Sequence, residues 1–207
     1  MWRFVLRENI LRFEALRDEA STDHDRERFQ KLIEDTEAEL NELRGASTPH
    51  VAEQDTALKY FADRAVDQGM KLSGGQFCTL QIYDERREDM IILAQCNHRA
   101  PFLHHLATMK PGDGSACGRC LASGRPAAIE DVDRDAEFAP HREKAKKAGF
   151  GAVHACPVRD GAGAVIAVIS VYFSTPRAFS ADELERMSAF AESIGPALES
   201  RLQAVSA

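Results

Sequence analysis

Two cysteines with the spacing Cys-x-x-Cys point most directly to chemistry in this chain. Cys117 and Cys120 stand in the sequence CGRC, which begins two residues after Ser115, and Ser115 is expected to open a short helix. The positive end of a helix dipole, together with Arg119, favours the thiolate form of a cysteine. Such a pair can act as a dithiol switch, because one thiol resolves the oxidation of the other.

A histidine and a third cysteine extend this set. His154 and Cys156 are two residues apart in an expected strand, so they face the same side of it. If that side meets the helix that carries Cys117 and Cys120, the four residues would bind zinc as a Cys₃His set. Free cysteine is, however, among the most buried residue types and behaves as a small hydrophobe. Packing is therefore the preferred interpretation, and redox or zinc chemistry is the alternative.

Three histidines, His98, His104 and His105, lie close together beside Phe102. A haem requires an axial histidine and an apolar slot, and this segment could supply the histidine. Histidine on a polar surface turn is the commoner outcome. We therefore expect no cofactor, with haem or zinc as the alternative. The sequence has no nucleophile elbow, Gly-rich phosphate loop or HExxH motif, so catalysis is not the first expectation.

The elements that must position these residues follow an α+β order, in which antiparallel strands alternate with helices. Ser180 and Glu183 form a capping box that opens the last helix, which runs to Leu202 with an expected kink at Gly195-Pro196. Asp160-Gly161 is a hairpin turn. The other expected helices span 56–72, 100–109 and 140–148, with a short one after Ser115, and the expected strands span 77–84, 90–96, 125–132, 150–158 and 164–173.

Residues 1–44 are expected to form a helical hairpin. Apolar residues recur there every three or four positions in two stretches, and Thr22 or Asp23 can cap the second helix. Because the apolar stripe is narrow, we expect a dimerisation element, with packing on its own domain as the alternative. Gly45–Gln54 is small and polar, as a linker is. The expected domains are therefore a hairpin at 1–44, a linker at 45–54 and a globular domain at 55–203.

Composition excludes several classes of protein. The 207 residues are 44% hydrophobic and 29% charged, which suits a folded domain. The net charge of −7 argues against nucleic acid as a partner. The longest apolar run, Ala162–Phe173, is shorter than the roughly 20 residues that cross a membrane, and Met1–Arg17 lacks the pattern of a signal peptide. We therefore expect a cytoplasmic chain whose five cysteines are reduced.

The segment Lys110–Met187 resembles bacterial GAF domains, the small-molecule-sensing modules of signalling proteins, and the resemblance extends over about residues 56–202. It implies a six-stranded antiparallel sheet with the terminal helices on one face. On the other face it implies a ligand pocket under loops and short helices, and it also implies dimers through the flanking helices. The features that carry the resemblance are Gly112, Gly114, Ser115, Gly118, Gly124-Arg125, Asp131-Val132, Phe138–Arg142, Cys156-Pro157-Val158 and Asp160-Gly161.

The resemblance implies a homodimeric regulatory sensor that binds a small molecule, or senses redox state, and signals through its terminal helices to a partner protein. The signatures of cyclic-nucleotide and bilin binding in the family are not evident. The alternative is a thiol enzyme similar to the free methionine sulfoxide reductases, with Cys117 as nucleophile, although the partner cysteines of those enzymes are missing. In such an enzyme Cys120 or Cys156 would resolve the oxidised form of Cys117. The expected ligand-binding residues are Phe102, His105, Ser115, Cys117, Cys120, His154 and Cys156.

Overall fold

The computed structural model of the protein describes residues 9–10, 13–15, 17–42, 49–84 and 89–205. It divides into two compact units, which are described separately. One unit comprises Met1–Leu58 with Ser200–Ala207, and the other comprises Lys59–Glu199. No helix in the described ranges combines the length and the apolar character needed to span a bilayer.

The first unit contains helix α2, Asp23–Glu42. Thr22 caps it as expected, because its hydroxyl accepts a hydrogen bond of 3.1 Å from the backbone N–H of Asp25. Ile33 and Leu40 are buried, seven positions apart on one stripe of the helix. The described residues between 9 and 18 are also helical. The hairpin and its role in dimerisation stay predictions, since residues 1–8, 11–12, 16 and 43–48 lie outside the described residues.

Helix α3 spans Pro49–Ser73, so it begins before the expected Thr56 and inside the segment expected to be a linker. Proline suits the first turn of a helix, because its missing N–H would have no partner there. The remainder of the expected linker, 45–48, lies outside the described residues. The helix ends as expected at Gly74, whose positive φ of 71° closes the last turn.

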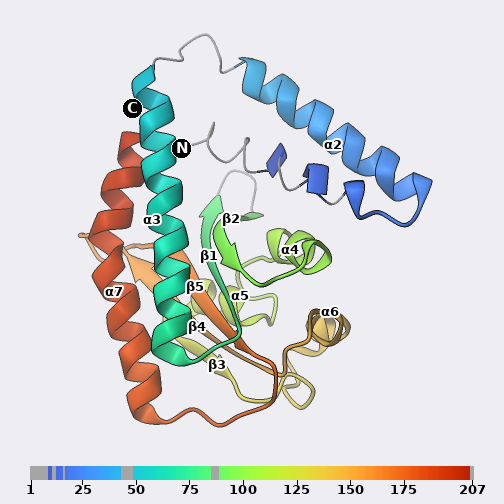
Figure 1. Ribbon diagram of the computed structural model, residues 1–207. Helices are drawn as coiled ribbons and strands as arrows, with labels where there is room; N and C mark the ends of the chain where they lie inside the picture. Colours follow the sequence, from blue (N-terminus) through green and yellow to red (C-terminus); the bar gives the residue numbers. More distant parts are fainter. Residues whose placement is uncertain (1–8, 11–12, 16, 43–48, 85–88, 206–207) are drawn as a thin grey trace. The chain divides into compact units, whose positions relative to one another are not determined.

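The second unit is built on an antiparallel sheet with the strand order β2-β1-β5-β4-β3 (Figure 1). The described residues form five strands rather than the six expected. The sixth followed from the family resemblance alone, whereas the residue patterns had indicated five strands. The strands are β1 Phe77–Asp84, β2 Asp89–Cys96, β3 Ala127–Ile129, β4 Ala152–Arg159 and β5 Val165–Phe173.

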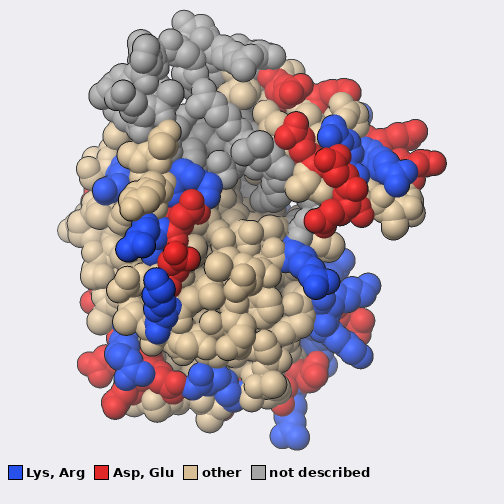
Figure 2. Space-filling model, viewed as in Figure 1, with Lys and Arg blue, Asp and Glu red and all other residues tan. Residues whose placement is uncertain are grey.

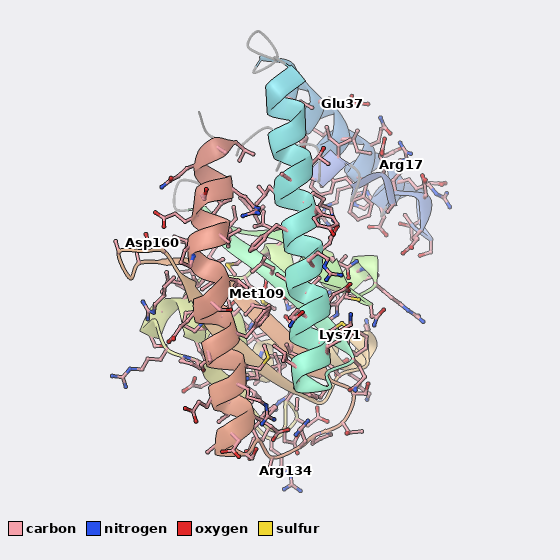
Figure 3. The ribbon with its side chains drawn as sticks, turned by 60° about the vertical axis from the view of Figure 1, so that its left-hand side comes forward. Arg17, Glu37, Lys71, Met109, Arg134 and Asp160 are labelled. Atoms are coloured by element: carbon pink, nitrogen blue, oxygen red, sulfur yellow. The ribbon has the colours of Figure 1, made fainter. Side chains whose placement is uncertain are left out.

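The part of α3 in this unit and helix α7, Ala181–Ala204, cover one face of the sheet. Gly69 marks the contact of all three, because a Cβ atom built there would lie 3.2 Å from Ile169 Cδ1 of β5 and 3.6 Å from the Phe190 ring of α7. Figure 3 shows the two helices side by side in front of the sheet. The capping box of α7 is confirmed, since Ser180 N–H donates to Glu183 Oε2 at 2.9 Å. The helix continues through Pro196.

Shorter helices cover the opposite face of the sheet (Figure 1). They are α4 Ala100–Ala107, α5 Ala116–Ser123, the 3₁₀ helix η2 Ala139–His141 and α6 Arg142–Ala148. Helices on both faces leave the central strands β4 and β5 buried on both sides, which explains why their sequences are nearly continuous apolar runs. Lysine and arginine side chains gather over α6 in Figure 2, where Lys144, Lys146 and Lys147 are exposed.

Candidate functional site

His154 and Cys156, two of the expected site residues, face α7 rather than α5. Along β4 they alternate with Val153 and Ala155, which belong to the apolar core on the α5 side of the sheet. The Cys156 Sγ atom accordingly lies 4.0 Å from Ser188 Oγ of α7. These two residues therefore lie outside the site that the short helices cover.

Cys117 and Cys120 lie on the other side of the sheet, in the apolar core beneath α5. The sheet consequently separates them from His154 and Cys156, so the four residues of the alternative Cys₃His zinc set are not brought together. Among the described residues, no group of three or more His, Cys, Asp and Glu side chains is placed to hold a metal ion. The spacing had indicated correctly that His154 and Cys156 share a face, but α5 packs on the odd-numbered residues of β4.

The cysteines under α5 are protonated. Burial raises the pKa of Cys117 to about 11, and it also raises the pKa of Cys120. Arg119, expected to favour a thiolate, instead pairs with Asp135 and donates to the Gly114 carbonyl at 2.9 Å. Burial therefore outweighs the helix dipole, and this arrangement supports packing over a reactive dithiol.

Side chains of the protein itself accept hydrogen bonds from the backbone N–H groups at the N-terminus of α5. Ser115 Oγ accepts from the N–H of Gly118 at 3.0 Å, and Asp113 Oδ1 accepts from the N–H of Ser115 at 2.9 Å. Met109 completes the surroundings of Cys117, with 3.2 Å between its Sδ and the Cys117 Sγ. Ser115 thus acts as the helix cap that the sequence indicated, and its hydroxyl is engaged in the fold.

His154 and Cys156 form a neutral contact on the α7 face. The His154 Nε2 atom lies 3.4 Å from Cys156 Sγ. Burial lowers the pKa of His154 to about 4 and raises that of Cys156 to about 12. An activated cysteine needs the opposite arrangement, a thiolate beside a charged imidazole, so this pair is not a nucleophile and its base.

Six rings fill the space between the sheet and helices α4 and α6. His98 stands among them, with its ring centroid 4.5 Å from that of Tyr172, 4.8 Å from Phe102 and 4.9 Å from Phe77. Its two ring nitrogens have no hydrogen-bond partner among the described residues, and burial lowers its pKa to about 3. These rings enclose the imidazole of His98, so a haem would have to displace them to reach it. The cluster consists of Phe77, His98, Phe102, Phe138, Phe150 and Tyr172.

Polar side chains are buried beside these rings, on the same face of the sheet. Thr79, Gln81 and Ser170 are 0% exposed. The Tyr172 hydroxyl lies 3.5 Å from Thr79 Oγ1, which donates to Gln81 Oε1 at 3.3 Å. Gln81 Nε2 and Ser170 Oγ have no hydrogen-bond partner in the part of the chain that the structure describes. We call Thr79, Gln81, Ser170 and Tyr172 the polar patch.

The polar patch was not found from the sequence, although it leaves a signal there. Thr79 and Gln81 stand two residues apart in an otherwise apolar strand, and Ser170 and Tyr172 do the same in β5. Because side chains alternate along a strand, such spacing places each pair on one face. An unpartnered buried polar group costs about 1–3 kcal/mol, so a fully buried amide without a partner calls for an explanation beyond folding.

His105 and His141 fasten the helices that cover this face. The His105 Nε2 atom of α4 lies 3.0 Å from His141 Nδ1, and His141 Nε2 lies 2.9 Å from the backbone carbonyl of Asp113. Of the ligand-binding residues expected from the sequence, Phe102, His105, Ser115, Cys117 and Cys120 therefore lie on the α4 and α5 side, and Phe102, Cys117 and Cys120 share one apolar core.

Comparison with known proteins gives one family. Residues 55–199 match the family model described as GAF domain. The fold is similar to that of the GAF domain of a phosphoenolpyruvate-protein phosphotransferase from Coxiella burnetii, with a TM-score of 0.60 and 14% identity over 72% of this chain and 86% of that one. It is also similar to that of a GAF domain/HD domain protein from Geobacter sulfurreducens. The TM-score is 0.58 and the sequence identity 16%, over 74% of this chain and 97% of that one.

A third similar structure is an enzyme, the type II free methionine-R-sulfoxide reductase from Thermoplasma acidophilum. Its TM-score is 0.54 and its identity 16%, over 69% of this chain and 96% of that chain. At such identities the likeness is one of fold. None of the curated proteins compared with the chain matches it.

Proposed function

Because the chain belongs to the GAF domain family, we propose that it is a regulatory sensor that binds a small molecule between the sheet and helices α4 and α5. The change is passed through α3 and α7 to a partner protein. The observation that carries this proposal is the amide of Gln81, which is 0% exposed and whose Nε2 has no partner among the described residues. A ligand group would satisfy it.

The strands offer a direct mechanical connection between the two faces. Ser170 of the polar patch is flanked by Ile169 and Val171, whose side chains point to the opposite face. Ile169 reaches α3 there, where a Cβ on Gly69 would lie 3.2 Å away from its Cδ1. Because the packed interior deforms little, a ligand that shifts β5 also changes the support of α3 and α7. The ligand must bind one arrangement of these helices better than the other.

We do not propose the thiol-dependent reductase as a second function. Reduction of a sulfoxide requires an accessible thiolate, whereas Cys117 is 2% exposed and its pKa is raised to about 11. Cys156, one of the two candidates to resolve it, lies across the sheet on the α7 face. The similarity to a methionine sulfoxide reductase is one of fold alone.

A homodimer is the second part of the proposal. The apolar stripe of the otherwise charged helix α2 supports it, because Leu32 stays partly exposed in the single chain and can pack against a second copy. Sedimentation of the full chain at micromolar concentration is expected to give twice the monomer mass. Leu32→Asp would shift the mass toward the monomer, and a wild-type chain that sediments as a monomer would contradict this part.

The test of the sensor function is thermal unfolding of the full chain with a panel of cellular metabolites. At least one compound is expected to raise the melting temperature, by an amount that grows with its concentration. The rise should disappear in Gln81→Leu and persist in Ser193→Ala, a control on the exposed side of α7. A panel in which no compound stabilises the wild-type chain would contradict the proposal.

A further inference from the structure

We infer that the ligand of the polar patch is an uncharged molecule that offers a hydrogen-bond acceptor to the side-chain amide of Gln81. The inference rests on the proposed sensor function and names the chemical class that the site takes. It depends on two features of the described residues, the direction of the hydrogen bonds in the patch and the absence of buried charge around it.

The hydrogen bonds of the patch leave a donor free. The carbonyl of Gln81 accepts from the Thr79 hydroxyl at 3.3 Å, and Thr79 in turn lies 3.5 Å from the Tyr172 hydroxyl, which is the donor of that contact. The chain of hydroxyl groups therefore ends on Gln81 Oε1. The Nε2 group carries two N–H donors without a partner, and only an acceptor can satisfy them.

Among the described residues, no charged side chain is buried beside the patch to neutralise a charged ligand. The buried polar residues of the described chain are Thr79, Gln81, His98, Ser115, His141, His154 and Ser170, with no Asp, Glu, Lys or Arg among them. The titratable groups nearest the patch are neutral, because burial lowers the pKa of His98 to about 3 and raises that of Cys117 to about 11. It also raises the pKa of Tyr172.

The charged side chains around the start of α5 are already paired. Arg119 pairs with Asp135, and both Asp113 oxygens accept backbone N–H groups, from Ser115 and from Lys110 at 3.1 Å. The molecular surface in front of β1 and β2 in Figure 2 is uncharged as well. A phosphate or carboxylate placed beside Gln81 would lose its hydration without gaining a counter-charge, and such a loss is large in an apolar interior.

The ligand has to displace side chains to reach the patch, because the neighbouring rings are in contact with one another. Because the rings beside the patch are aromatic, small aromatic molecules are suitable probes. Four fluorobenzenes of similar size differ in the property at issue. 4-Fluoroacetophenone is neutral and only accepts hydrogen bonds, 4-fluoroaniline is neutral and mainly donates, 4-fluorobenzoate is an anion and 4-fluorobenzylamine is a cation.

The experiment is a ¹⁹F NMR titration of the full chain with each probe. 4-Fluoroacetophenone is expected to bind at least about tenfold more tightly than the other three. Gln81→Leu should weaken its binding about tenfold or more, whereas Ser193→Ala should leave it unchanged. Leucine removes the unpartnered Nε2 group together with the Oε1 atom that accepts from Thr79, whose hydroxyl can donate to Tyr172 instead, so the variant is expected to melt close to the wild type. Its melting temperature is measured alongside, so that a loss of binding is distinguished from unfolding.

The possible outcomes separate the inference from the proposed function. Tightest binding by 4-fluorobenzoate, 4-fluorobenzylamine or 4-fluoroaniline, lost in Gln81→Leu, would overturn the neutral-acceptor class and leave the sensor site in place. Failure of all four probes to bind would overturn the inference. If no compound of the metabolite panel bound either, the proposed sensor function would be contradicted as well. Binding of 4-fluoroacetophenone that is unaffected in Gln81→Leu would also overturn the inference.

Discussion

His105 and His141 share a single hydrogen bond of 3.0 Å between His105 Nε2 and His141 Nδ1. The role of the His141 ring follows from Asp113, whose backbone carbonyl lies 2.9 Å from His141 Nε2 and can only accept. His141 Nε2 therefore carries a proton and donates to this carbonyl, while its other ring nitrogen is bonded to His105. The 6%-exposed ring of His141 thus links α4 to the turn before α5.

Removing this link is expected to loosen the short helices over the sheet. In His141→Leu both hydrogen bonds are lost and the Asp113 carbonyl loses its donor, which should lower the free energy of unfolding by about 1–3 kcal/mol. Lys144→Ala, three residues along on the exposed side of α6, should change it by less than about 0.5 kcal/mol. Urea unfolding measures both, and equal values for the two variants would contradict the prediction.

Two buried histidines make the fold sensitive to acid. Burial lowers the pKa of His98 to about 3 and that of His154 to about 4, below the ordinary 6.5. Between these pKa values and 6.5, the histidines bind protons in the unfolded chain but not in the folded chain. The free energy of unfolding is therefore highest above pH 6.5 and falls as the pH drops from there toward 4. Each histidine contributes a loss of up to about 1.4 kcal/mol per pH unit.

The variant His98→Phe isolates one of these contributions, because the carboxylates that also titrate in acid are common to both chains. Between pH 6 and pH 4.5 its free energy of unfolding should fall less steeply than that of the wild type, by about 1 kcal/mol per pH unit. Chemical denaturation at several pH values gives the two slopes. Parallel slopes would show that His98 does not stay neutral in the folded chain.

The cysteines should differ in reactivity according to burial. Cys96 is partly exposed, whereas Cys78, Cys117, Cys120 and Cys156 are buried. At pH 8 iodoacetamide is expected to label Cys96 first, and the four buried thiols only at the rate at which the chain opens, because the thiolate is the reacting form. Mass spectrometry of peptides follows each site. Rapid labelling of Cys117, together with reduction of free methionine sulfoxide that is lost in Cys117→Ser, would revive the thiol enzyme.

The close contact between α7 and the end of β4 leaves no room for a side chain. A Cβ atom on Gly195 would overlap the carbonyl oxygen of Arg159. Gly195→Ala is therefore expected to lower the free energy of unfolding by about 1–3 kcal/mol, despite the better helix propensity of alanine. Gly69→Ala is the matched control, since its Cβ meets only flexible side chains, at 3.2 Å or more. Equal stability of the two variants would contradict this account.

The sequence predicted the elements well where local chemistry decides them. The bounds of β1 agree with the prediction, Ser115 and Ser180 cap their helices as expected, and Gly149 ends α6 with a φ of 82°. Each of these rests on a residue type whose conformational preference is strong. The family resemblance supplied the arrangement of the sheet and its helices, and the sixth strand came from it as well.

The candidate site could be predicted only in part. Alternation along a strand placed His154 and Cys156 on one face, but which face α5 covers depends on tertiary packing, and the zinc hypothesis failed there. The direction of a pKa shift depends on burial in the same way, so Cys117 could not be assigned as a thiol from its position near a helix N-terminus. The sequence shows Gln81 as a polar residue in an apolar strand, but it does not show that its Nε2 atom lacks a hydrogen-bond partner among the described residues.

Gly195 also brings the backbone of α7 directly against the sheet. At this point the helix lies on the Arg159 carbonyl with no side chain between them, so a displacement of the end of β4 would reach α7 without being absorbed by a change of rotamer. A spectroscopic probe of such a displacement therefore belongs on the exposed side of α7 close to Gly195.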